Sequence, residues 1–405
     1  MRDRSATRRS WLRAVAAGAA LVAFAGGCTA GSGREARSAA SSPATGPSAT
    51  ASPTTAAIAR RTVTILGAGD VLVHPPVWAQ ARADARAAGR AGFDFFPMFA
   101  TVRPAISGAD LAICHLETPL ATPDGPFLGY PRFSVPPQVL DGVKGAGFDA
   151  CSTASNHTID QGERGVRRTV DALDAAGLGH AGSARTAREA ATPVLYDVGG
   201  VRVGHLAYTA HLNGLRPPAG EDWLVNVVDV ATIAAAAHRL RAAGAQIVVL
   251  SLHWGTEYEH APDSDQRALA ARLIASPDID LILGHHAHVV QPFERFGSKW
   301  VVYGMGNELA RHAEPINDNR EGVMARMTFS EYAPGRWRVA RAEAIPTWTQ
   351  ISPAIRLVDL SAALGNAATP PSVRGVYRAA YDRVAGYTLG RGGAAEGLVV
   401  VPPGG

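Results

Sequence analysis

Three histidines directly follow a buried-strand pattern in this chain. Leu281–Leu283 are apolar, Gly284 ends the run, and His285, His286 and His288 come within the next four positions. An apolar run that stops at a glycine predicts a strand entering a tight turn. Side chains at the carboxyl end of such a strand project from a rigid support, and imidazole is a common metal ligand. This segment therefore predicts a metal-binding site.

Five other strand-like runs also end in residue types that ligate metals. These endings are Asp70, Glu117, Asn156, His253 and Asn307. Carboxylate, amide oxygen and imidazole suit manganese, iron and zinc, and no thiolate is conspicuous among them. Each residue alone has an ordinary explanation as a turn residue, a helix cap or a solvated side chain. Six strands that share such an ending indicate one common site.

The chemistry available to such a site is hydrolysis by two metal ions. Two divalent ions about 3.5–4 Å apart, bridged by a carboxylate, lower the pKa of a bound water and hold a phosphate oxygen during in-line attack. A neighbouring histidine can then protonate the leaving oxygen. Manganese, iron or zinc would serve, so the expected cofactor is a pair of divalent metal ions.

The elements that must position these residues alternate between strand and helix. Strand patterns end at the six positions above, and Gly199-Gly200 links two further apolar runs as a hairpin. The run at 299–307 is expected to be a single strand. Helical patterns are expected at 78–88, 93–106, 136–146, 163–176, 230–243, 264–275 and 373–384. This alternation predicts an α/β fold with antiparallel portions beside it.

Two cysteines, Cys114 and Cys151, lie inside apolar strand-like runs. Buried free cysteines behave as small apolar residues, so we expect two buried thiols rather than a disulfide. The sequence does not determine whether they pair.

The first 28 residues resemble a bacterial export signal. Arg8-Arg9 fits a twin-arginine signal, and the uncharged run at 14–25 is too short to span a bilayer as a helix. Small residues before Cys28 resemble a lipoprotein cleavage site, at which this cysteine would be diacylated. The alternatives are cleavage to a free secreted protein or retention of the segment. In each case we expect the folded body outside the cytoplasm, and lipidation would anchor it to the cell membrane.

The remaining chain divides by composition. Residues 29–60 are rich in Ser, Ala, Thr and Pro and are expected to form a disordered tether. Residues 61–350 are expected to form one domain. Residues 351–405 are expected to form a C-terminal extension that packs on this domain and ends in a disordered tail.

The net charge argues against a nucleic-acid partner. The formal charge is +4, but the first 27 residues carry five arginines and one aspartate, so the remainder is near neutral. The basic pI therefore belongs to the leader. No run after residue 28 is apolar enough to cross a membrane.

The motif order is similar to that of calcineurin-like metallophosphoesterases, and the motifs together resemble the CapA family of poly-gamma-glutamate capsule-synthesis proteins, which carry the PGA_cap domain. The matching segments are GDVLVH at 69–74, LETPL at 116–120, SNHTIDQG at 155–162, HWGTEY at 253–258 and GHHAHVVQP at 284–292. The resemblance covers roughly residues 63–307 and implies a four-layer αββα metallophosphatase-like sandwich. The chain departs from the family's usual asparagine at His115.

The resemblance also implies a role for each matching position. One metal ion would be held by Asp70, His74 and His288. The other would be held by Asn156, His253 and His286. Glu117 would bridge the two ions, and His157 would protonate the leaving group.

Two functional hypotheses follow from these observations. The first is a surface-anchored, metal-dependent hydrolase of a phosphoester or related bond that takes part in capsule or poly-gamma-glutamate synthesis or export. The second is a non-catalytic polymer-binding accessory subunit of a synthesis complex. The expected partners are an anionic polymer or phosphoester substrate and the membrane subunits of a polymer synthase. Lys144 and Lys299 are the only lysines and the arginines are scattered, so no basic stripe for a polymer is evident.

Overall fold

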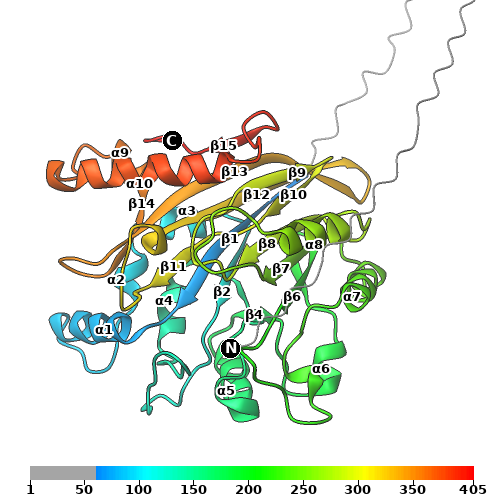
Figure 1. The fold of residues 1–405 in the computed structure, drawn as a ribbon, viewed down its shortest axis with the longest axis horizontal. Helices are drawn as coiled ribbons and strands as arrows, with labels where there is room; N and C mark the ends of the chain where they lie inside the picture. The colour runs from blue at the N-terminus through cyan, green and yellow to red at the C-terminus, as the bar shows by residue number, and fades with distance from the viewer. Residues whose placement is uncertain (1–60) are drawn as a thin grey trace, which may run out of the picture. The chain divides into compact units, whose positions relative to one another are not determined.

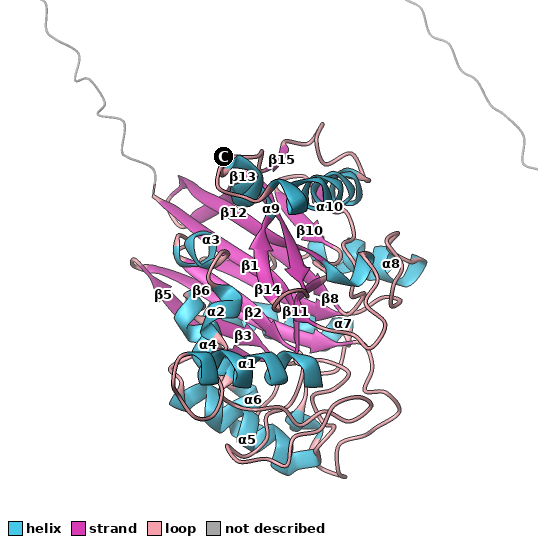
Figure 2. Ribbon diagram, turned by 90° about the vertical axis from the view of Figure 1, so that its left-hand side faces the viewer, coloured by secondary structure: helices cyan, strands magenta, loops and turns pink. Residues whose placement is uncertain are grey.

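Two β-sheets stack face to face in the computed structural model, which describes residues 61–405 (Figures 1 and 2). The expected export signal (residues 1–28, with Cys28) and tether (29–60) lie outside the described residues. The inner faces of both sheets share one apolar core, in which Ile65 and Ile113 of the first sheet pack with Val249 and Leu283 of the second. Helices cover the outer faces. The predicted four-layer αββα arrangement is therefore confirmed.

The first sheet contains nine strands in the order β14-β13-β12-β1-β2-β3-β4, with β11 beside β1 and β15 beside β13. Their bounds are β1 (Thr62–Leu72), β2 (Leu111–Leu116), β3 (Ala150–Ser152), β4 (Gly179–Ala181), β11 (Asn307–Ala310), β12 (Glu321–Ala333), β13 (Arg336–Gln350), β14 (Arg356–Asp359) and β15 (Leu398–Val400). Strands β1 to β4 run parallel, whereas β12, β13 and β14 are antiparallel to their neighbours along the order. The parallel half carries Asp70 on β1, and Glu117 and Asn156 follow β2 and β3.

The second sheet contains six strands in the order β5-β6-β7-β8-β10-β9. Their bounds are β5 (Leu195–Val198), β6 (Val201–Thr209), β7 (Ile247–His253), β8 (Leu281–His285), β9 (Phe293–Phe296) and β10 (Lys299–Val302). The four inner strands are parallel, and an antiparallel strand closes each edge. The predicted hairpin at Gly199-Gly200 joins β5 to β6, and both glycines have positive φ.

The helices cover the two outer faces and one end of the sandwich. Their bounds are α1 (Pro75–Ala87), α2 (Phe96–Phe99), α3 (Arg103–Ser107), α4 (Val139–Ala146), α5 (Gly162–Ala175), α6 (Ala187–Ala191), α7 (Val230–Ala242), α8 (Ser264–Ile274), α9 (Leu360–Gly365) and α10 (Pro371–Leu389). Helices α1 to α4 pack on the first sheet, and α7 and α8 pack on the second. Within the described part, no helix has the length and apolarity needed to cross a membrane.

Prolines account for two differences from the predicted helices. The region 93–106 forms two short helices, α2 and α3, and each begins with a proline in its first turn. Pro75 and Pro76 likewise occupy the first turn of α1, which therefore starts three residues before the predicted boundary. A proline lacks an N–H, and the first turn of a helix leaves that group unpaired in any case.

The segment 299–307 is not one strand, so that prediction is wrong. It leaves the second sheet at the end of β10 and enters the first sheet as β11, which pairs with β1 at Asp70 and Asn307. Gly306 has φ 66° and lies between the two strands. The crossing between the sheets matters for the site because Asn307 belongs to the first sheet, beside Asp70, and not to the same strand as residues 299–302.

Cys114 and Cys151 form a disulfide, so the prediction of two free thiols is wrong. They are directly opposite in the register of the parallel strands β2 and β3, with Cα atoms 4.4 Å apart. The pairing depends on strand register, which no local pattern in the sequence specifies.

The C-terminal end is ordered, contrary to the prediction of a disordered tail. Helices α9 and α10 pack on the first sheet (Figure 1), and β15 then adds to β13 at residues Ala342–Ala344. Val401 accepts hydrogen bonds from the hydroxyls of Ser361 and Tyr381 at 2.7 and 3.1 Å. These bonds tie the last residues to both C-terminal helices.

Gly284 is predicted to be irreplaceable at the end of β8. A Cβ atom there would lie 1.9 Å from the carbonyl oxygen of Tyr303 and 2.7 Å from Nε1 of Trp254, and both are fixed in the core. We expect Gly284→Ala to lower the free energy of unfolding by about 3 kcal/mol or more. Urea denaturation of the purified variant measures this change.

Gly375 is the matched control because a Cβ at this exposed position in α10 would meet nothing within 4 Å. Gly375→Ala should raise the free energy of unfolding by about 0.5–1 kcal/mol, through the better helix propensity of alanine. Equal effects of the two substitutions would contradict the close approach of β8 to residue 303.

Candidate metal centre

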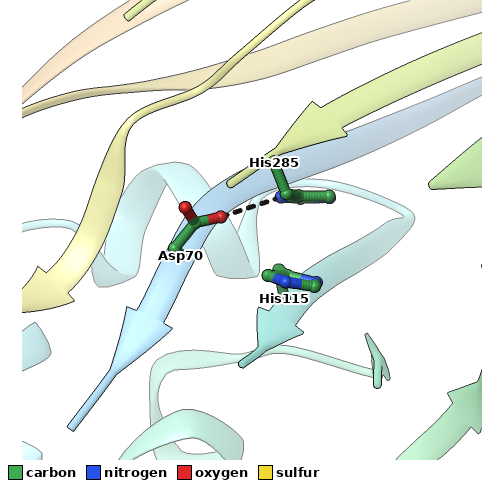
Figure 3. A group of neighbouring side chains, drawn as sticks. All are labelled: Asp70, His115 and His285. Atoms are coloured by element: carbon green, nitrogen blue, oxygen red, sulfur yellow. Dashed lines mark hydrogen bonds and ion pairs between the residues drawn. The ribbon is translucent and has the colours of Figure 1, made fainter. Parts of the chain in front are cut away.

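The predicted ligand residues meet where strand ends from both sheets converge. Figure 3 shows Asp70 on β1, His115 on β2 and His285 on β8 pointing toward one another. The first two strands belong to the first sheet and β8 to the second. The site therefore lies between the sheets, at the carboxyl ends of their parallel strands, and strands distant in sequence position its side chains.

Asp70 is the fixed centre of the cluster and has no exposed surface. Its Oδ1 lies 3.2 Å from Nδ1 of His285, and its Oδ2 accepts a hydrogen bond from the backbone N–H of His286 at 3.2 Å. Oδ2 also lies 3.2 Å from Nδ1 of His288. Burial alone would raise the pKa of this carboxyl, but the hydrogen bonds from His285 and His288 hold it well below its usual range. Asp70 is therefore an ionised carboxylate.

Glu117 is fully buried, and neither of its carboxylate oxygens has a hydrogen-bond partner among the described residues. Its nearest cationic group is Nε2 of His288, 3.6 Å from Oε1. Burial raises the pKa of Glu117 well above its usual value. A buried carboxylate without a partner is costly. A divalent cation would satisfy it, since ligand atoms of Asp70, Glu117 and His288 lie within 4.8 Å of one another.

His288 carries the positive charge that balances this pair of carboxylates. Burial alone would lower its pKa, but Glu117 and Asp70 raise the pKa of His288 to about 9. Its Nδ1 is also 3.0 Å from Oδ1 of Asn307. The imidazole is therefore protonated at neutral pH in the metal-free protein, and it must release that proton to ligate a metal.

A second group of side chains surrounds His253. Its Nε2 is 3.1 Å from Oδ1 of Asn156, and its ring lies 4.6 Å from that of His286. Burial lowers the pKa of His253 well below its usual value, and burial with the nearby His288 lowers the pKa of His286 to about 3. Both imidazoles are therefore neutral at pH 7, which is the form that binds metals. The predicted residues Asn156, His253 and His286 are thus brought together.

His115 and His285 connect the two groups, and the resemblance assigned neither of them a ligand role, although His285 belongs to the segment that predicts a metal site. Their rings stack with centroids 4.0 Å apart. Nε2 of His115 is 3.0 Å from Nδ1 of His253, and His285 contacts Asp70. Ligand atoms of Asp70, His115 and His285 lie within 4.8 Å of one another, so these residues form a further candidate metal group. Two features of the sequence could have indicated these residues as ligands. His115 replaces the family's usual asparagine, and His285 is the last residue of β8.

Loop residues complete the mouth of the site and were also missed. Nε2 of His211 lies 3.0 Å from Nε2 of His286, and the His312 ring lies 5.3 Å from that of His288. Glu257 forms a candidate metal group with His286 and His288. These residues lie on irregular segments, so no periodic pattern marks them.

His74 occupies a different place from the one that the resemblance implies. Its Nδ1 is 3.0 Å from the carbonyl oxygen of Leu72, and its ring lies 4.7 Å from His312. In residues 61–405 it belongs to no group whose ligand atoms all lie within 4.8 Å of one another. His74 therefore lies at the edge of the cluster, and the other predicted ligands form its centre.

The His157 imidazole is held in place by Asp160 and Phe133. Its Nδ1 lies 2.7 Å from Oδ2 of Asp160, which also accepts a hydrogen bond from the backbone N–H of Phe133 at 2.8 Å. The Phe133 ring packs edge-on against the imidazole, with centroids 4.8 Å apart. These contacts fix the ring orientation and leave Nε2 as the nitrogen available to exchange a proton.

Backbone strain is concentrated around this cluster. The non-glycine residues with positive φ in residues 61–405 are Asn213, Tyr258, His286 and His288. Oδ1 of Asn213 accepts a hydrogen bond from Asn156, and the Tyr258 ring lies 6.1 Å from that of His288. Such conformations cost on the order of 1–3 kcal/mol each and persist where the surrounding structure enforces them. All four residues therefore border the candidate metal centre.

Comparison with known proteins identifies a family for most of the folded body. Residues 64–311 match the family model described as "Bacterial capsule synthesis protein PGA_cap". The chain is 29% identical to "Capsule biosynthesis protein CapA" of Bacillus anthracis, over 54% of this chain and 54% of that protein. It is 28% identical to "Probable polyglutamine synthesis accessory protein" of Mycobacterium tuberculosis, over 55% and 59%. The chain thus spans about half the length of these relatives.

Two solved structures are also similar. A phosphatase from Mycoplasma pneumoniae has a TM-score of 0.43 and 12% identity, covering 71% of this chain and 94% of that one. The calcineurin-like phosphoesterase YfkN from Bacillus subtilis has a TM-score of 0.41 and 16% identity, covering 80% and 99%.

Metal binding at this centre should release protons. His288, with a pKa of about 9, is protonated at pH 7 without metal, so its ligation of Mn²⁺ should release about one proton per chain. Calorimetric titration in two buffers of different ionisation enthalpy measures this number. In Glu117→Gln the number of protons released should fall, because the Glu117 charge that raises the pKa of His288 is removed. Heats that do not depend on the buffer would contradict the assignment of these residues as ligands.

Proposed function

The chain belongs to the PGA_cap family of bacterial capsule synthesis proteins, and from this premise we propose a metal-dependent hydrolase that serves the synthesis or export of an anionic capsule polymer. The bond cleaved is a phosphoester or a related bond. The polymer is of the poly-gamma-glutamate type, as the names of the relatives suggest. The activity, the substrate and the partners are all parts of this proposal.

One observation carries the catalytic part of the proposal. The Glu117 carboxylate is fully buried with both oxygens unpartnered, and it is surrounded by imidazoles that are mostly neutral. A buried carboxylate without a partner is unfavourable unless a ligand satisfies it. Carboxylate and imidazole together form a donor set for borderline divalent metals. The site residues therefore fit the two ions that the sequence predicts.

The proposed ligands follow the contacts of the site. Asp70, Glu117 and His288 would hold one ion, with His74 beyond them at the edge. Asn156, His253 and His286 would hold the other. Bound ions would polarise the substrate's phosphoryl oxygen and lower the pKa of a water. His115 and His285 would keep the two ligand groups in fixed relation.

His157 is the proposed general acid. Asp160 holds its Nδ1, so the proton passes to the leaving oxygen from Nε2. Only 5% of the His157 surface is exposed, which limits loss of the proton to bulk water.

The proposed location is outside the cytoplasm, with a lipid on Cys28 as the membrane anchor and polymer-synthase subunits in the membrane as partners. Support comes from the leader sequence and from the disulfide between Cys114 and Cys151. Disulfides persist in oxidising compartments outside the cytoplasm. The near-neutral charge of the body after the leader gives no support for a nucleic-acid partner.

We expect the purified protein with Mn²⁺ to hydrolyse bis-p-nitrophenyl phosphate. Glu117→Ala and His286→Ala should reduce kcat/KM by at least about 100-fold, because each removes a metal ligand. His157→Gln should reduce kcat by about 100-fold while the metal content stays at the wild-type level. Release of p-nitrophenol and elemental analysis of the same samples measure both quantities.

His238→Ala is the control, since this histidine lies on α7 with 77% of its side chain exposed. It should behave as the wild type. Turnover that survives in Glu117→Ala would contradict the proposed centre. A fully metal-loaded protein without turnover of any phosphodiester would favour the non-catalytic polymer-binding role instead.

A further inference from the structure

A cavity opens directly beside the proposed acid His157. It has a volume of about 200 Å³, and Asp160, the partner of His157, is one of its lining residues. Arg132 and Arg216 also line it, from two different loops. The first turn of α5 contributes Gly162 and Glu163. The cavity is therefore adjacent to the site, and its charged groups determine what it can hold.

Both arginines are uncommitted. Within residues 61–405, neither Arg132 nor Arg216 forms an ion pair or donates a side-chain hydrogen bond. Among the neighbouring arginines of the described chain, Arg167 pairs with Glu163 at 2.6 Å and Arg185 pairs with Asp171 at 2.7 Å, whereas Arg164 has no ion pair either. A guanidinium has five N–H donors in a planar fork that matches a carboxylate or phosphate. Two such groups are therefore free to bind an anion.

The acidic residues that line the cavity do not neutralise these arginines. Asp160 is committed to His157 and to the backbone N–H of Phe133. Glu163 is committed to Arg167. At the N-terminal turn of α5, the N–H of Gly162 donates to the carbonyl oxygen of Ile159 at 2.9 Å, and the N-cap residue Gln161 makes no side-chain capping bond in the described part of the chain. A helix N-terminus favours negative charge. The charged groups that remain unpaired at the cavity are therefore the two arginines, which favour an anionic group.

Each arginine lies on a loop that is fixed to the site. Arg132 precedes Phe133, whose ring and N–H hold His157 and Asp160 in place. Arg216 lies on the loop after β6, on which His211 contacts His286 and Asn213 accepts a hydrogen bond from Asn156. Both arginines therefore lie on loops that contact residues of the proposed site.

We propose that this cavity is a subsite for a carboxylate group of an anionic chain substrate, next to the bond that is cleaved. The proposal rests on the proposed function for the identity of the neighbouring site. A cavity of about 200 Å³ accommodates one acidic side group and is too small for a folded polymer. A chain would cross the mouth of the site with one carboxylate in the cavity. Such a local pair of arginines makes a continuous basic stripe unnecessary.

Fluorescence anisotropy of a fluorescein-labelled, γ-linked glutamate oligomer with the purified protein at low salt tests the subsite directly. We expect the double variant Arg132→Ala/Arg216→Ala to raise Kd by about tenfold, the combined loss of two exposed ion pairs. Arg272→Ala is the matched control, because Arg272 is an exposed arginine of α8 without an ion pair in the described part of the chain. It should leave Kd unchanged.

Three results separate this proposal from the proposed function. Equal Kd values for the double variant and Arg272→Ala, or no binding by the wild type at millimolar oligomer, would overturn the subsite. Tighter binding of a polyphosphate of equal charge, also lost in the double variant, would overturn the assignment to carboxylate. A tenfold higher Kd in the double variant, with an unchanged Kd in Arg272→Ala, supports the subsite whether or not the wild type hydrolyses phosphodiesters.

Discussion

The structure depends on keeping one carboxylate, that of Glu117, buried in the space between two sheets with no hydrogen-bond partner in residues 61–405. Such a group is unfavourable for folding by itself, so the surrounding fold must enforce its position. The close packing around it does so. A Cβ at Gly69 would lie 2.2 Å from the carbonyl oxygen of Gly306, and one at Gly284 would lie 1.9 Å from that of Tyr303. His286 and His288, which follow β8, also have positive φ angles of 88° and 55°.

Electrostatics complete the account of the centre. The ionised Asp70 and the protonated His288 offset each other, while burial keeps His115, His253 and His286 neutral. The cluster therefore combines neutral imidazoles, which can bind a metal, with the buried Glu117 side chain, whose pKa is raised by burial. A divalent cation that replaces the proton on His288 would satisfy the whole group at once. The unpaired arginines beside His157 extend the same preference toward an anionic substrate.

Much of this arrangement could be predicted from the sequence, because strand patterns that end in ligand residues are local signals. Asp70, Glu117, Asn156, His253, His286 and His288 all lie in the cluster. The rest depends on how strands are placed in space. His115 and His285 matter only because β2 faces β8 across the sheets, and Cys114 meets Cys151 only through strand register. The crossing that places Asn307 in the first sheet and the loops that bring His211 and His312 have no periodic signature.

The central claim, that these residues form a dinuclear metal centre, is tested most directly by the metal-to-protein ratio. The protein and its Glu117→Ala variant would be purified without chelator and measured side by side by elemental mass spectrometry. We predict about two divalent ions per chain in the wild type, as in other two-metal sites, with a sharp fall in the variant. No metal in either sample, even after soaking with manganese, zinc or iron, would contradict this account of the site.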